Sequence, residues 1–106
     1  MYIVVICTVP GENKAYEISK KIIENKLAAC VNYFKAFSIF EWKGKIEEVE
    51  EYVLIIKTKE ETFPKLEDFI KKLHPYQVPE IISLKIDKGN LDYLKWIEET
   101  VKGSNP

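Results

Sequence analysis

The order of apolar and polar residues predicts extended structure over much of the first half of the chain. Residues 2–9 are apolar on both parities and rich in β-branched side chains, which is typical of a strand covered on both faces. We therefore expect this strand in the interior of a sheet. Residues 29–42 and 45–58 also have an extended pattern, and Lys43-Gly44 between them favours a tight reversal. Together they predict a β-hairpin with unusually long arms.

Helical periodicity appears in two segments that flank the hairpin. Residues 14–24 follow Pro10 and Gly11 and repeat their apolar side chains every three or four positions, with lysines and glutamates between them. Residues 63–73 show the same spacing. Pro64 is acceptable there because the first turn of a helix has no partner for the missing N–H. Both patterns indicate amphipathic helices.

The last part of the chain predicts a strand and a short helix. Residues 80–87 alternate, and Gly89-Asn90 offers a start for a helix whose apolar stripe is Leu94, Ile97 and Val101. The order βαββαβ plus a C-terminal helix is the split βαβ arrangement of an α+β fold, with the expected strand order 4-1-3-2. A whole strand then separates Cys7 from Cys30, so we expect two free thiols.

The predicted hairpin carries more apolar surface than two ordinary helices can cover. The aromatic residues along its arms include Phe34, Phe37, Phe40, Trp42 and Tyr52. A patch of this size on an open sheet favours self-association, so we expect these residues at an interface between copies of the chain. Two alternatives stay open: the hairpin curls over the sheet's own open face, or the C-terminal helix covers that face with Tyr93 and Trp96.

Four glutamates stand close together on the second arm, namely Glu47, Glu48, Glu50 and Glu51. Neighbouring positions on a strand point to opposite faces, so most of these carboxylates cannot converge on one cation. We expect a solvated strand edge here.

Composition sets limits on class and function. The chain has 106 residues, 46% of them hydrophobic, which predicts one domain over residues 1–106. Its 16 basic and 17 acidic residues are interspersed, so nucleic acid is not an expected partner. No apolar run approaches the ~20 residues of a membrane helix, and we expect a cytoplasmic protein. No nucleophile is paired with an oriented base, so we expect no enzyme.

The single histidine lies in a segment that two prolines make rigid. Pro75 and Pro79 restrict the residues before them, His74 and Val78, to extended backbone. A rigid loop holding His74 and Glu80 could bind a ligand. It could also serve only to connect the second helix to the last strand, and a lone histidine favours this second interpretation.

Several motifs in order along residues 4–97 resemble one known family. They are Cys7-Thr8-x-Pro10, the Leu-Ala-Ala-Cys-Val-Asn of residues 27–32, Trp42-x-Gly44-Lys45, Lys57-Thr58, the His-Pro-Tyr-x-Val-Pro-Glu-Ile of residues 74–81, and Tyr93-Leu94-x-Trp96. The chain is similar in these motifs to the divalent-cation tolerance proteins called CutA. The resemblance implies a ferredoxin-like protomer that forms a homotrimer through its long strands, the architecture of PII signalling trimers.

The resemblance also implies a role in the response to divalent metal ions, with copper as one candidate. The family's proposed metal ligands correspond to Cys7 and His74 in this chain, while Leu73 stands where a second histidine is found. Thiolate and imidazole suit copper, and Glu80 is a possible additional oxygen ligand. A different function is a PII-like signalling trimer without catalytic activity that binds a small molecule in clefts between subunits.

Overall fold

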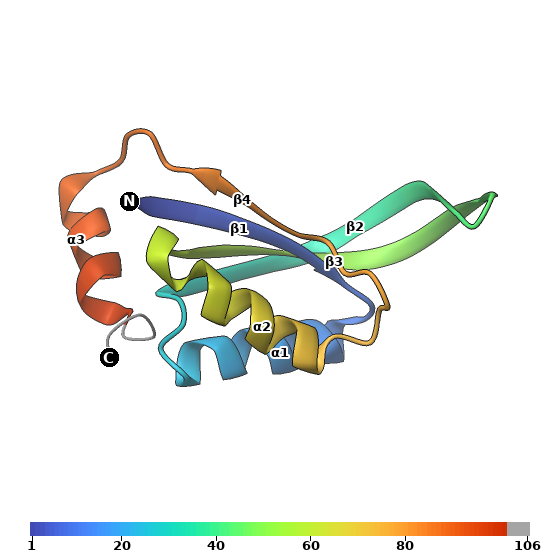
Figure 1. Ribbon diagram of the computed structural model, residues 1–106, viewed down its shortest axis with the longest axis horizontal. Coiled ribbons are helices and arrows are strands. Elements are labelled where there is room, and N and C mark those ends of the chain that lie inside the picture. The colour runs from blue at the N-terminus through green and yellow to red at the C-terminus, as the bar shows by residue number, and fades with distance from the viewer. Residues whose placement is uncertain (102–106) are drawn as a thin grey trace.

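Four strands form one antiparallel sheet in the order β2-β3-β1-β4 (Figure 1). The computed structural model describes residues 1–101. Its elements are β1 Tyr2–Val9, α1 Glu12–Glu24, β2 Cys30–Trp42, β3 Lys45–Lys59, the 3-10 turn Glu60–Thr62, α2 Phe63–Leu73, β4 Ile81–Lys85 and α3 Leu91–Thr100. The predicted element order and strand order are confirmed. No helix in this part of the chain is long and apolar enough to cross a membrane.

Helices α1 and α2 lie on the same side of the sheet (Figure 1) and create the main core there. On β1, side chains alternate between fully buried and half-buried, because odd-numbered residues face the helices. Val5 and its neighbour Ile56 on β3 are fully buried, as are Ile18 of α1 and Leu66 of α2. The interior position of β1 is confirmed, but in the single chain only one of its faces is fully covered.

The other side of the sheet, here called the open face, has an apolar centre without a helix over it. Cross-strand neighbours share a face, and the pairings place these apolar side chains together: Val4, Ile6, Phe34, Val53, Ile55, Ile82 and Leu84. Phe34, Ile82 and Leu84 are each half exposed or more. The centre of the open face is therefore a contiguous apolar surface on the single chain.

The β2–β3 hairpin extends well beyond the helices (Figure 1). Trp42 pairs with Lys45, so the loop has two residues, as predicted. Both have positive φ, 52° at Lys43 and 81° at Gly44, as the type I′ turn that matches the twist of paired strands requires. Glycine adopts this left-handed conformation without steric cost.

Helix α3 covers only one end of the open face. Asn90 Oδ1 accepts a hydrogen bond from the Tyr93 N–H at 3.0 Å, which confirms the predicted N-cap. Ile97 and Val101 are buried in a small second cluster that includes Ala29. Tyr93 and Trp96 remain 40% and 43% exposed, so they do not cover the centre of the open face as one alternative supposed.

The two cysteines are free, as predicted. Cys7 pairs with Leu54 on β3, whereas Cys30 pairs with Lys57 across the other edge of that strand. The strand between them keeps the thiols apart.

Candidate functional site

His74 terminates α2 and fixes the loop that follows. Its backbone is extended, with φ −81° and ψ 134°, as expected for a residue before proline. The ring is almost fully buried. Nε2 lies 2.7 Å from the Thr8 carbonyl oxygen, and Nδ1 accepts the Tyr76 N–H at 3.1 Å. The hydrogen therefore resides on Nε2, and both ring nitrogens are engaged.

Cys7 lies on the helix-facing side of β1 and is fully buried. Its Sγ is 3.8 Å from the same Thr8 carbonyl oxygen. Burial, followed by the negative charges of Glu80 and Glu51, raises the pKa of the Cys7 thiol to about 12. Cys7 is thus a protonated thiol at neutral pH.

The structure brings Cys7 and His74 to one carbonyl oxygen but does not add a third ligand. Glu80 precedes Ile81, the residue that pairs with Cys7, so its position on the strand faces the other side of the sheet. Within residues 1–101 no group of three or more His, Cys, Asp and Glu residues could hold a metal ion. A metal ion at Cys7 and His74 would have to displace at least one hydrogen bond of the ring and the proton of the thiol.

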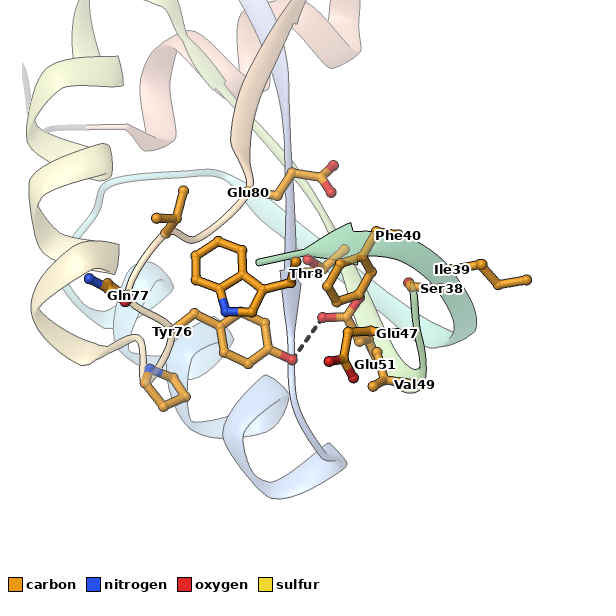
Figure 2. A pocket seen from close by; sticks show the side chains of 13 residues that line it. Thr8, Ser38, Ile39, Phe40, Glu47, Val49, Glu51, Tyr76, Gln77 and Glu80 are labelled. Atoms are coloured by element: carbon orange, nitrogen blue, oxygen red, sulfur yellow. Dashed lines mark hydrogen bonds between the residues drawn. The ribbon is translucent and has the colours of Figure 1, made fainter. Parts of the chain in front are cut away.

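A pocket with a volume of about 680 Å³ lies between the hairpin and the proline-flanked loop (Figure 2). The hairpin residues that line it occupy strand positions on the open-face side of the sheet, except for Ile39, which is on the other side. The polar lining residues are Thr8, Ser38, Glu47, Glu51, Tyr76, Gln77 and Glu80, and the apolar ones are Ile39, Phe40, Trp42, Val49, Pro75 and Val78. Three carboxylates thus face one pocket that no lysine, arginine or histidine lines.

A hydrogen bond joins the two walls of this pocket. The Tyr76 hydroxyl donates to Glu51 Oε2 at 2.8 Å (Figure 2). Burial, followed by the hydrogen bond and charge of Glu51, raises the pKa of Tyr76 to about 12, so its hydroxyl stays a donor. Glu51 is only 4% exposed. In the described part of the chain, no salt bridge joins a basic group to Glu47, Glu51 or Glu80.

Comparison with protein families gives a match over residues 3–100 to the family described as CutA1 divalent ion tolerance protein. The chain belongs to this family. The resemblance found in the motifs is confirmed, and the ferredoxin-like α+β fold agrees with it.

Curated CutA relatives are similar over most of this chain. The divalent-cation tolerance protein CutA of Thermus thermophilus is 47% identical over 97 residues, which cover 91% of this chain and 94% of the relative. Human Protein CutA is 45% identical over 96 residues, or 90% of this chain. The chain spans only 54% of the length of the human protein.

Solved CutA structures have the same fold. The structure described as the periplasmic divalent cation tolerance protein CutA from Archaeoglobus fulgidus superposes with a TM-score of 0.95 at 41% identity, covering 96% of this chain and all of the other. The Thermus thermophilus structure gives a TM-score of 0.93 at 46% identity, with coverage of 96% and 100%. The long hairpin and the three helices are therefore family features.

Glu47 and Glu51 are acidic residues of the pocket that were not predicted from the sequence of this CutA chain. The glutamate run was expected to be a solvated edge, which is wrong for Glu51, because the hairpin and the Tyr76 loop bury it. Glu47 and Glu51 share one face, as the pairings of Glu47 with Phe40 and Glu51 with Ala36 show. Glu47 and Glu51 are four positions apart, and residues an even number apart on a strand point to the same side. This spacing was the sequence feature that could have predicted their common face.

The aromatic residues predicted at a subunit interface lie in different environments in the CutA chain. Phe40 and Trp42 line the pocket, and Phe34 lies on the open face. Phe37 is 78% exposed and occupies a strand position on the other side of the sheet, the side of the helices. Tyr52 is half-buried and stacks edge-on against Tyr33, with ring centroids 6.0 Å apart, on the helix side. Phe34, Phe40 and Trp42 are therefore the members that share the parity of the open face.

Proposed function

We propose that this protein is a homotrimeric divalent-cation tolerance protein that takes part in the cytoplasmic response to metal ions by binding, without catalysis. The observation that carries this proposal is the pocket that faces Glu47, Glu51 and Glu80 and has no basic side chain in its lining. Such a cleft concentrates cations through its negative potential. Relatives named for divalent-cation tolerance support the same role.

The three carboxylates do not form a coordination cage, so the ion in this proposal keeps part of its water shell and binds weakly. A copper site at Cys7 and His74 stays a prediction within the same function. It needs the thiol to lose its proton and the ring to lose at least one hydrogen bond; thiolate favours Cu(I), and imidazole suits copper in either state.

The open face supports the trimer. Phe34, Ile82 and Leu84 of its apolar centre are half exposed or more in the single chain, and soluble monomers rarely leave so contiguous an apolar surface in water. In the trimer the centre of the open face is buried between subunits, and the pocket lies near the subunit boundary.

Equilibrium dialysis against copper, zinc and manganese ions tests the metal role. We expect Glu51→Gln to weaken binding of all three ions, while Glu24→Gln, an exposed substitution on α1, changes nothing. A specific copper site at Cys7 and His74 predicts loss of copper binding alone in Cys7→Ala and His74→Ala. Binding that none of these substitutions alters would remove both sites, and absence of binding would remove the metal role.

A PII-like trimer that binds a small molecule is the second candidate function. The pocket favours it, because a volume of about 680 Å³ lies within the usual range of small-molecule sites. A ligand selective for the folded trimer must raise its melting temperature. A metabolite screen by thermal shift tests this candidate, and a screen in which nothing raises the melting temperature counts against it.

A further inference from the structure

We infer that the pocket between the hairpin and the proline-flanked loop binds a small organic cation, an amine or ammonium group attached to an apolar body. The inference rests on the proposed small-molecule role and names the chemical class of that ligand. It concerns the residues of Figure 2 and does not involve Cys7 or His74.

Glu51 is a buried carboxylate without a basic partner among the described residues. Glu51 as a residue is only 4% exposed, so its carboxylate has less hydration than a surface glutamate, and such a cost is normally offset by a cation or by several hydrogen bonds. Here the Tyr76 hydroxyl gives a single neutral hydrogen bond to Oε2. No basic nitrogen of residues 1–101 forms a salt bridge with this carboxylate. A bound ammonium group would supply the missing positive charge and donate to Oε1.

The other charges of the pocket have the same sign. Glu47 lies on the same face of β3 as Glu51, and Glu80 approaches from the loop that enters β4. An anionic ligand would meet three carboxylates and no counter-charge, so electrostatics exclude it. A neutral ligand would not compensate the negative charge of the carboxylates, and it would gain no charge–charge attraction from them.

The walls of the pocket distinguish an organic cation from a bare metal ion. Trp42 and Phe40 line it from the hairpin, and Tyr76 and Pro75 line it from the loop. Aromatic faces attract ammonium groups and also bury apolar surface. A hydrated metal ion has no apolar surface to bury, and its water shell keeps it away from the aromatic faces. The Tyr76 oxygen keeps lone pairs while its hydrogen bonds Glu51, so it can accept from the same ammonium group.

Three probes that share a phenylethyl body and differ in charge test the inference: phenethylamine, phenethyl alcohol and 3-phenylpropionate. Binding to the full chain is measured at pH 7 by calorimetry and ligand-observed NMR. We expect the amine to bind at least roughly tenfold more tightly than the alcohol, because its hydrogen bonds are charge-assisted. The carboxylate probe should bind most weakly.

Substitutions locate the site. Glu51→Gln keeps the acceptor for Tyr76 but removes the charge, so amine affinity should fall roughly tenfold while alcohol affinity stays constant. Tyr76→Phe should preserve the preference for the amine, since it leaves all three carboxylates in place. Glu24→Gln, remote from the pocket on α1, is the matched control and should bind like the parent.

Each other result would overturn a defined part of the inference. Equal or tighter binding of the alcohol or the carboxylate probe would overturn the cationic class and leave the small-molecule role standing. Amine binding that Glu51→Gln does not weaken would place the cation elsewhere. If none of the three probes binds, the inference fails, and a hit of another class in the metabolite screen would then preserve the small-molecule role without it.

Discussion

His74 Nε2 lies 2.7 Å from the carbonyl oxygen of Thr8, so one buried imidazole joins the C-terminal end of α2 to the end of β1. Its second nitrogen accepts the Tyr76 N–H and thereby sets the course of the loop. Tyr76 in turn bonds Glu51 on the hairpin. The only histidine of the chain thus fixes the position of the loop that forms one wall of the pocket.

Replacing His74 by alanine should destabilise the protein by about 2–4 kcal/mol, because the Thr8 carbonyl and the Tyr76 N–H both lose a buried partner. His74→Gln can still donate to Thr8 and should recover part of the loss. Urea denaturation measures these differences, with the exposed Lys72→Ala as control. A loss below about 0.5 kcal/mol in His74→Ala would contradict the structural role.

Alkaline pH should destabilise the fold partly through Cys7. The pKa of its thiol is about 12 in the folded chain, against 9.0 as the ordinary value. Between these values the unfolded chain has released a proton that the folded chain retains, so stability falls as pH rises from 9 to 12. Urea unfolding across this window should show a flatter pH dependence for Cys7→Ala than for the parent. Parallel curves would refute the assignment. Tyr76, raised from 10.0 to about 12, adds a second decline of the same sign.

Glu51→Gln should raise the stability of the ligand-free protein by about 1 kcal/mol at pH 7, although it weakens ligand binding. The amide oxygen still accepts from Tyr76, while the cost of burying an unpaired charge disappears. The exposed neighbour Glu48→Gln is the control on the same strand and should change stability little. Lower stability of Glu51→Gln than of the parent would show that the carboxylate is already compensated in the free protein.

A charge at the centre of the open face should separate the subunits. Phe34→Glu places a carboxylate among apolar side chains of the proposed interface, where burial without a partner is costly. Light scattering after size exclusion should give the mass of one 12.4 kDa chain for this variant and of three for the parent. Tyr16→Glu, on the far side of α1, is the control and should keep the parent's mass. A parent that is monomeric would exclude the trimer.

The hairpin turn should tolerate asparagine better than alanine at Gly44. Its φ is 81°, and a Cβ there would meet no atom within 4 Å, so only the backbone conformation is strained. Gly44→Ala should cost about 1–2 kcal/mol and Gly44→Asn clearly less, because asparagine populates the left-handed region more readily. Thermal unfolding of the three proteins checks this order. Equal loss in both variants would point to a different cause.

Much of the fold could be predicted because its signals are local. Lys43-Gly44 specifies the two-residue turn, Pro64 occupies a first helical turn, and Asn90 caps α3. The strand order followed from the right-handed crossovers of the split βαβ arrangement. The last strand, Ile81–Lys85, is shorter than the predicted 80–87, although the Ile86 N–H still donates to the Tyr2 carbonyl oxygen at 2.9 Å.

The pocket could not be predicted in the same way because it depends on how the hairpin and the loop meet. Alternation places Glu47 and Glu51 on one face, but it does not show that Tyr76 reaches that face and buries Glu51. Similarly, the sequence places Cys7 and Glu80 near one another along paired strands, whereas their parity sends them to opposite faces. Cys7 and His74 both approach the Thr8 carbonyl oxygen, and the metal site predicted at these two residues stays a prediction.

The pairing of Phe40 with Glu47 and of Ala36 with Glu51 has a consequence for the history of this hairpin. Adding or deleting a single residue between Glu47 and Glu51 would turn the part of β3 on the tip side of the change to the other face, and Glu47 would leave the pocket. The stretch between these two glutamates can therefore change in length only by an even number of residues, unless a bulge compensates for an odd change.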